Sequence, residues 1–308
     1  MKMHLQQQTV GESHTFEGKG LHTGKVARMT VNPAPADFGI KFRRIDLGDD
    51  AVIEALADNV SSTARSTAIS FGDASVMTIE HILSALTGMG VDNALIDIDN
   101  VEVPILDGSA KPYIDAIWQD GKGVVSQNAP RKYIEISSPI EIRNEETGSF
   151  VRVEPADEPS FDIKIDFNSQ VLGEQTAHWN LSVPYVAEVG ICRTFVFFHE
   201  LEFLFKNNLI KGGDVDNAIV IVEHPVSKEQ LESMASLFNV PVLERRDNGY
   251  LSNNVLRFEN ECARHKLLDL IGDLRLVGGF MKAKVTAFKA GHTINTKVAK
   301  AIRESLES

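Results

Sequence analysis

The chain has 308 residues, of which 43% are hydrophobic and 24% are charged. This is the composition of an ordinary soluble globular protein, and the length suggests about two domains. The net charge of -12 argues against broad nucleic-acid binding, because the surface offers no general excess of positive charge to neutralise a phosphate backbone.

Membrane insertion and disulfide bonding are not expected either. No apolar run reaches the roughly 18 residues needed to span a bilayer, and the polar N-terminus lacks the apolar core of a signal peptide. We therefore expect a cytoplasmic protein without an integral membrane segment. The only two cysteines, Cys192 and Cys262, form neither a disulfide framework nor a CxxC motif. Any metal ion must be bound by histidine and carboxylate side chains.

Hydrophobic periodicity predicts strands and helices in both halves of the chain. In the first half the predicted strands are residues 27–31 and 94–98, and the predicted helices are residues 77–87 and 111–118. In the second half the predicted strands are residues 132–142, 150–154, 161–167 and 283–288, and the predicted helices are residues 197–206, 228–238, 260–274 and 295–307. Neither half shows the regular alternation of a doubly wound sheet, so we expect an α+β fold.

Turn-forming residues at 119–131 interrupt the patterned segments. We place a linker there and predict two domains, residues 1–125 and residues 126–308, each built of a layered sheet and helices.

Candidate metal ligands occur in two helix-like segments. His265, Asp269 and Asp273 recur every four residues, so they share one face of the helix predicted at 260–274. That spacing suits two ligands with a further acid behind them. However, a chain of 308 residues with nine histidines and 43 acidic residues contains roughly one histidine–acid pair at a spacing of four by chance. An ordinary hydrogen bond on the helix surface is therefore the alternative to a metal site.

The other segment carries Glu80 and His81. Thr78 is suited to cap this helix, which would place Glu80 in the first turn, where backbone N–H groups and the helix dipole favour an ionised carboxylate. A carboxylate beside a ligand histidine is a general base in many metallohydrolases. An ordinary capped helix with an acidic first turn is the alternative. Two histidines and one aspartate would complete a three-ligand catalytic site.

Separated segments of the chain closely resemble the zinc-dependent UDP-3-O-acyl-N-acetylglucosamine deacetylases of Gram-negative lipid A biosynthesis. The matching segments are residues 18–24, 80–81, 103–110, 193–195, 216–218, 256–259, 264–273 and 291–292. They follow the family's order over nearly the whole chain, so signals that are weak singly become strong together. The resemblance implies a hydrolase that releases acetate from UDP-3-O-(3-hydroxyacyl)-N-acetylglucosamine, the committed step of lipid A biosynthesis.

The matching motif positions imply the following roles. His81, His265 and Asp269 would bind one zinc ion per chain, at the interface between the two domains. Glu80 would be the general base, and His292 would be the cationic partner or the proton donor to the leaving amine.

Three further residues would support this chemistry. Asp273 would orient His292 and raise its pKa. Lys266 would face polar groups of the substrate. Thr194 would donate a hydrogen bond to the developing oxyanion.

The aromatic stretch that begins at Phe195 corresponds to a hydrophobic passage for the 3-hydroxyacyl chain in this family. From its pattern alone, a buried amphipathic helix is the favoured interpretation. Phe195 and the candidate wall residues Leu201, Ile210 and Val215 would contact the substrate by analogy.

Two more substrate contacts are implied by the resemblance. Phe167 would stack on uracil, or else it simply ends a strand. His22 would approach the site from a glycine-rich loop, although the glycines there look more like turn residues than a phosphate cradle.

We expect a monomer whose partner is the UDP-linked acylated glucosamine, with transient contact to the inner-membrane surface. A catalytically silent UDP-sugar or lipid-binding protein of the same fold is one alternative, and a zinc amidase acting on another acylated sugar is a second. The intact set of candidate catalytic residues favours the deacetylase. In some bacteria a hydroxyacyl-carrier-protein dehydratase is fused to this enzyme, and the present chain does not contain a complete one.

Overall fold

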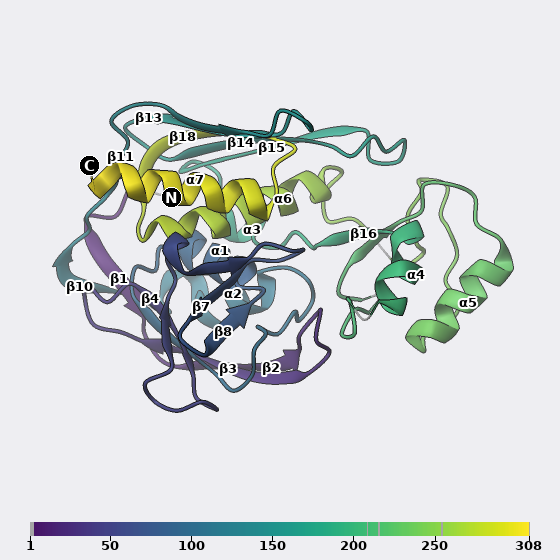
Figure 1. The fold of residues 1–308 in the computed structure, drawn as a ribbon, viewed down its shortest axis with the longest axis horizontal. Helices are drawn as coiled ribbons and strands as arrows, with labels where there is room; N and C mark the ends of the chain where they lie inside the picture. Colours follow the sequence, from purple (N-terminus) through teal and green to yellow (C-terminus); the bar gives the residue numbers. More distant parts are fainter. Residues whose placement is uncertain (1–2, 208, 215, 254, 308) are drawn as a thin grey trace.

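Mixed sheets and helices build both halves of the chain in the computed structural model, which describes residues 3–207, 209–214, 216–253 and 255–307 (Figure 1). The helices are α1 (Glu80–Met89), α2 (Lys111–Ile117), α3 (Tyr185–Glu188), α4 (Phe198–Lys206), α5 (Lys228–Phe238), α6 (Glu261–Leu274) and α7 (His292–Glu307). This architecture confirms the predicted α+β class.

The first half of the chain contributes β1 (Gln6–Val10), β2 (His14–Lys19), β3 (Val26–Pro33), β4 (Ile40–Arg44), β5 (Val52–Glu54), β6 (Val60–Ser62), β7 (Ala68–Phe71), β8 (Ala74–Met77), β9 (Ala94–Ile98) and β10 (Val124–Pro130). One sheet has the order β2-β3-β9-β4-β5, and β4 and β9 are its parallel pair. A smaller sheet has the order β6-β7-β8. Along β9, Ala94, Ile96 and Ile98 alternate into the core, as the period of two predicts.

The second half contributes β11 (Ile134–Glu135), β12 (Ile140–Arg143), β13 (Phe150–Pro155), β14 (Ser160–Asp166), β15 (Glu174–Asn180), β16 (Phe195–Phe197), β17 (Ile219–Ile221) and β18 (Met281–Phe288). Its main sheet has the order β12-β13-β18-β14-β15, with β11 paired to β18. Helices α6 and α7 cover one face of this sheet (Figure 1). The buried faces of both helices therefore form a core with β13, β14 and β18.

Helix α1 of the first half packs against helix α6 of the second half at the centre of the molecule (Figure 1). The side chains of Ile82, Leu83 and Leu86 on α1, and those of Leu267 and Leu270 on α6, are fully buried. This contact fixes the position of one candidate ligand helix relative to the other.

A side lobe, residues 195–251, projects from this body and carries β16, α4, β17 and α5 (Figure 1). It has its own small apolar core, to which Leu201, Leu204, Val220 and Met234 belong. The parallel pair β16 and β17 connects the lobe to the body.

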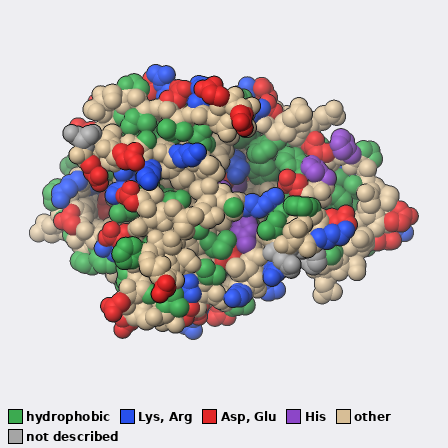
Figure 2. Space-filling model, viewed as in Figure 1, with side chains coloured by type: hydrophobic (Ala, Val, Ile, Leu, Met, Phe, Trp, Pro, Cys, Tyr) green, Lys and Arg blue, Asp and Glu red, His purple; other side chains and the backbone are tan. Residues whose placement is uncertain are grey.

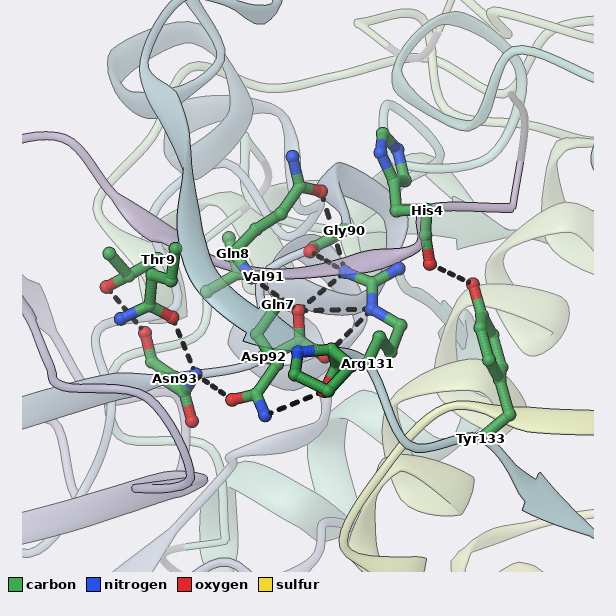
Figure 3. A network of polar contacts seen from close by, with 12 residues as sticks. His4, Gln7, Gln8, Thr9, Gly90, Val91, Asp92, Asn93, Arg131 and Tyr133 are labelled. Atoms are coloured by element: carbon green, nitrogen blue, oxygen red, sulfur yellow. Dashed lines mark hydrogen bonds and ion pairs between the residues drawn. The ribbon is translucent and has the colours of Figure 1, made fainter.

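The connection between the two halves is a paired strand rather than the predicted open linker, because β10 is antiparallel to β1. Directly after β10, the buried Arg131 donates hydrogen bonds from Nε to Asp92 Oδ1, at 2.9 Å, and from Nη2 to Asp92 Oδ2, at 2.6 Å (Figure 3). Its Nη2 atom also donates to the carbonyl oxygen of Gly90 at 2.6 Å. Tyr133 adds a hydrogen bond to the carbonyl oxygen of His4. The connection is thus tied to the C-terminal end of α1. The division into domains at residues 1–125 and 126–308 stays a proposal, and its boundary falls inside β10.

Most predicted elements are confirmed, and three boundaries were wrong. The helix predicted at 77–87 begins at Glu80, because residues 74–77 form β8. Thr78 does not cap it, since Ile79 is the N-cap residue and the Thr78 hydroxyl binds Glu102 instead.

The other two wrong boundaries lie in the second half. The strand predicted at 132–142 is divided into β11 and β12, which pair with different neighbours, β18 and β13. The last helix begins three residues earlier than predicted, so His292 lies in its first turn. Within the described ranges, no helix is both long enough and apolar enough to cross a membrane.

Candidate active site

The two candidate ligand segments meet as the sequence predicts. The N-terminal end of α1 presents His81, and α6 presents His265 and Asp269 one turn apart. One potential ligand atom from each of the three buried side chains lies within 4.8 Å of the others. The Asp269 Oδ1 atom is 3.4 Å from His265 Nε2 and 3.6 Å from His81 Nε2. This cluster is the only group of its kind in the part of the chain that the structure describes.

The donor set fits a divalent metal ion. Asp269 Oδ1 is buried and has no hydrogen-bond partner among the described residues. A buried carboxylate oxygen without a partner is costly unless a cation satisfies it. The backbone carbonyl oxygen of Cys192 accepts a hydrogen bond from His265 Nδ1, 3.1 Å away, which leaves the Nε2 lone pair facing Asp269. Burial also lowers the pKa of His265 to about 3, so its imidazole is neutral, as a ligand must be.

Lys266 neutralises the other oxygen of the same carboxylate. Its Nζ atom donates to Asp269 Oδ2 at 2.8 Å. Burial alone would raise the pKa of Asp269, but His265 and Lys266 outweigh it and hold this pKa well below its usual value. Asp269 is therefore ionised, with one oxygen on Lys266 and the other directed at the two imidazoles.

A second polar cluster lies beside the three ligands and contains Glu80, Asp273 and His292. His292 Nδ1 is 2.9 Å from Asp273 Oδ2, and His292 Nε2 is 3.9 Å from Glu80 Oε1. Burial would lower the pKa of His292, but the carboxylates of Asp273 and Glu80 raise it to about 9. The imidazole is therefore a cation at neutral pH in the metal-free protein.

Glu80 differs from the sequence expectation. Burial raises its pKa, although His292 and His81 oppose the rise, so the helix terminus does not keep this carboxylate as acidic as predicted. A carboxylate with a raised pKa is a stronger base once it is ionised.

Two functional candidates in this cluster were missed from the sequence. Thr67, which is fully buried, donates its hydroxyl to Asp273 Oδ1 at 2.6 Å and its backbone N–H to Glu80 Oε2 at 3.1 Å. Asn295 donates its amide to Asp273 Oδ2 at 2.9 Å. Asn295 lies one helical turn after His292, which was a usable signal. Thr67 carried no such signal, because it is distant in sequence from both of its partners.

A cavity of about 250 Å³ opens over the three ligands. It continues from the polar floor into the side lobe, and a space-filling view shows histidine side chains in the hollow between the lobe and the body (Figure 2). Of the residues predicted from the sequence, those that line the cavity are Glu80, His81, His265, Lys266, Asp269, His292, Thr194, Phe195, Leu201, Ile210 and His22.

Thr194 is held at this cavity by its backbone. Its N–H donates to the Gly108 carbonyl oxygen and its own carbonyl oxygen accepts from the Ile219 N–H, both at 2.8 Å.

Two predicted substrate contacts have a different outcome. Phe167 does not line the cavity: its ring, in a side chain that is 44% exposed, packs edge-on against Phe195, with 5.4 Å between the centroids. It lies at the outer end of an aromatic cluster that also contains Phe197. Val215 lies outside the described residues.

Two imidazoles and a carboxylate, with a separate acid and imidazole beside them, are the donor set that metal-dependent hydrolases use. The chain belongs to the UDP-3-O-acyl N-acetylglycosamine deacetylase (LpxC) family, whose model matches residues 7–236 and 225–304. This match confirms the resemblance found in the sequence.

Curated relatives match the chain over nearly all of its length. It is 42% identical to the "Bifunctional enzyme LpxC/FabZ" of Porphyromonas gingivalis over 98% of this chain and 65% of the relative. It is also 42% identical to the "Bifunctional enzyme LpxC/FabZ" of Bacteroides thetaiotaomicron, again over 98% of this chain and 65% of the relative. The "UDP-3-O-acyl-N-acetylglucosamine deacetylase" of Cellvibrio japonicus is 36% identical over 99% of this chain and 92% of the relative. The chain thus spans 65% of the length of the two bifunctional relatives.

Proposed function

We propose that this chain is a zinc-dependent hydrolase that removes the N-acetyl group from UDP-3-O-(3-hydroxyacyl)-N-acetylglucosamine in the committed step of lipid A biosynthesis. Family membership and the printed name of the Cellvibrio japonicus relative support this substrate class. The observation that carries the proposal concerns the Asp269 Oδ1 atom, which has no hydrogen-bond partner in the described part of the chain and is buried between two imidazole nitrogens 3.4 and 3.6 Å away.

His81, His265 and Asp269 would hold one zinc ion. Zinc accepts nitrogen and oxygen ligands, and three protein ligands leave a position open for catalysis. When bound, the ion polarises the acetyl carbonyl and makes the attacking water more acidic. Because His81 comes from the first half and the other two ligands from the second, the active site would lie at the interface of the two proposed domains.

Glu80 would be the general base. It accepts one proton from water as the water oxygen attacks the acetyl carbon. The carboxylate is well placed for this role, since it is buried beside the ligand His81 and lines the cavity. Its raised pKa makes it a better proton acceptor than an exposed carboxylate.

His292 would donate the proton that the sugar nitrogen needs when the carbon–nitrogen bond breaks. Acetate then leaves with the oxygen of the water, and the amine remains on the sugar. The pKa of about 9 keeps the imidazole protonated at neutral pH, as a proton donor or cationic partner must be. Asp273 orients this imidazole through the 2.9 Å contact with Nδ1, which directs Nε2 toward the side of Glu80.

Thr194 and Lys266 would stabilise charge around the reacting carbonyl group. Both line the cavity, and Lys266 carries a charge that Asp269 maintains, because the ion pair raises the lysine pKa despite burial. Thr194 would donate its hydroxyl to the oxyanion, and Lys266 would face the polar groups of the substrate.

The side lobe would receive the 3-hydroxyacyl chain. Leu201, Ile210 and Phe195 form apolar parts of the cavity wall. His22 lines the same cavity. Phe167 lies outside the cavity, against Phe195. It would contact the uracil if the nucleotide extends past Phe195.

The remaining expectations stay predictions: a monomer, a cytoplasmic location and transient contact with the inner-membrane surface. A catalytically silent UDP-sugar or lipid-binding protein is the competing function. The full set of proton-transfer groups beside the ligands favours the hydrolase, because a binding protein has no need for a buried base and a buried imidazolium.

The proposal is tested by acetate release from UDP-3-O-(3-hydroxyacyl)-N-acetylglucosamine by the purified protein. The assay is run as prepared, after chelation, and after zinc is restored. We expect release to disappear on chelation and to return with zinc. A folded, zinc-bound sample that releases no acetate would contradict the proposed reaction, and release that survives complete chelation would contradict the proposed role of the metal.

A further inference from the structure

Glu102 is a buried carboxylate that the proposed mechanism does not use. It is 1% exposed and accepts three hydrogen bonds, from the Thr78 hydroxyl at 3.0 Å and from the backbone N–H groups of His22 at 2.9 Å and Thr23 at 2.8 Å. These donors come from two segments far apart in sequence, and Thr78 and His22 both line the catalytic cavity. One carboxylate therefore joins two walls of the cavity.

The first wall is the turn that leads into α1. Thr78 is a β-branched residue with a φ of 61°, a left-handed conformation that such residues rarely adopt. Backbone pairing of Met77 with Val101 and Val103 fixes the preceding residue. The hydroxyl bond to Glu102 holds this unusual turn, which ends two residues before Glu80.

The second wall is the loop formed by residues 20–24. It rests on the side lobe, because His22 Nδ1 donates to the Leu209 carbonyl oxygen at 2.8 Å. The Gly212 N–H donates to the Leu21 carbonyl oxygen at 3.0 Å. Ile210, which lines the acyl part of the cavity, lies between these two contact points.

Two glycines make this close packing possible. A Cβ atom on Gly20 would overlap the Glu102 carboxylate, and a Cβ atom on Gly212 would overlap the Gly20 carbonyl oxygen. The contacts therefore run without a gap from Ile210 through the loop to Glu102, and from Glu102 through Thr78 to Glu80.

We infer that Glu102 is a positioning residue that sets the distance between the acyl-chain wall and the catalytic helix α1, and so contributes to acyl-length preference. The inference rests on the proposed function for its substrate. A carboxylate suits the task, because it accepts several N–H and O–H donors at once and its charge strengthens each bond.

The test compares Glu102→Gln with Thr78→Val and Thr78→Ser. Glu102→Gln keeps the size of the side chain but places an NH₂ group against donors. Thr78→Val removes only the hydroxyl bond to the catalytic side, and Thr78→Ser keeps that hydroxyl. Amide hydrogen exchange of residues 20–24 and 209–213 is measured without substrate, and kcat and KM are measured for a long and a short 3-hydroxyacyl substrate.

For Glu102→Gln we expect faster exchange in both segments and a fall of roughly tenfold in the ratio of kcat/KM for the long over the short substrate, the effect of losing one charged hydrogen bond. Thr78→Val should lower kcat for both substrates, leave the exchange of residues 209–213 unchanged, and change the ratio less than Glu102→Gln does, because the two bonds from the loop to Glu102 remain. Thr78→Ser should recover most of that kcat. A general loss of stability would affect both substrates alike in both variants. A positioning role instead predicts that Glu102→Gln acts mainly on the kcat/KM ratio of the two substrates and Thr78→Val mainly on kcat.

The inference is overturned if a folded Glu102→Gln protein shows wild-type exchange in both segments and a wild-type ratio. It is equally overturned if Thr78→Val changes the ratio as much as Glu102→Gln does. If the wild-type protein hydrolyses neither substrate, the proposed function fails, and the exchange data alone then decide whether Glu102 couples the two walls.

Discussion

Gly272 of α6 packs directly against the backbone carbonyl oxygen of Glu80 at the start of α1, and a Cβ atom at this glycine would overlap that oxygen. The missing side chain lets the two helices approach closely enough for His265 and Asp269 to meet His81. Glycine at this position is thus a requirement of the helix packing and, through it, of the candidate metal site.

Gly272→Ala should therefore weaken folding and metal binding together. Overpacking of a rigid backbone contact costs about 1–3 kcal/mol, and the helices must separate to accommodate the methyl group. The free energy of unfolding and the dissociation constant for zinc are measured on the same preparations. Gly291→Ala is the control, because nothing lies within 4 Å of its Cβ position. Equal stability and equal zinc affinity in the two variants would contradict the packing argument.

The His292–Asp273 pair should make the stability of the metal-free protein depend on pH. Because the folded pKa of His292 is raised from 6.5 to about 9, its contribution is fully present below pH 6.5 and is lost as the pH rises through about 9. The contribution is at most about 3–4 kcal/mol, since one pKa unit corresponds to about 1.4 kcal/mol. Asp273→Asn should therefore lose more stability at pH 6 than at pH 9.5, as measured by denaturant unfolding.

The exposed pair of His178 and Asp162, 2.7 Å apart, is the control for that measurement. Asp162→Asn should change the unfolding free energy by less than about 0.5 kcal/mol at either pH, because solvent screens an exposed ion pair. If Asp273→Asn shows the same stability loss at both pH values, the raised pKa of His292 is contradicted.

Thr67 should prove important for catalysis through its hydroxyl group. Thr67→Val removes the donor to Asp273 Oδ1 but keeps the size of the side chain, and a buried carboxylate that loses a donor costs about 1.5–3 kcal/mol. We expect a fall in kcat of about tenfold or more and a shift of the basic limb of the rate profile to higher pH, because a carboxylate without this donor holds the proton on His292 more strongly. Thr67→Ser keeps the hydroxyl and should stay within about threefold of the wild type. Wild-type rates and pH profile in Thr67→Val would remove Thr67 from the account.

Ile210 should limit the length of the acyl chain. Ile210→Phe adds volume to the cavity wall, so kcat/KM should fall for a long 3-hydroxyacyl substrate and change little for a short one, because added bulk in a packed site costs about 1–3 kcal/mol. Phe203→Leu is the control, since this side chain on α4 is 60% exposed. A uniform loss for both chain lengths in Ile210→Phe would contradict a wall position.

The cluster of candidate metal ligands could be predicted from the sequence, because two of its three residues are spaced one helical turn apart. His265 and Asp269 share a helix face whatever the tertiary structure is, and the family motifs added His81. Thr67 and Glu102 could not be predicted in this way, because their partners lie in segments that only the fold brings together. Pairing also overrode local signals: the turn-forming residues before Arg131 became strand β10 because β1 lies beside them.

At the start of α1, too, a tertiary contact overrides the local sequence signal. Thr78 has a residue type that favours N-caps, but Glu102 takes its hydroxyl, so the helix begins without a side-chain cap. The burial that raises the pKa of Glu80 is likewise a property of the assembled core and not of the helix terminus.

The central claim is that Glu80 is the base of a metal site to which it is not a ligand. Its most direct test is acetate release by Glu80→Gln measured together with bound zinc. We expect one zinc ion per chain, as in the wild type, and a rate at least about 100-fold lower, the usual contribution of a general base. A variant that keeps its zinc and its wild-type rate would contradict the account.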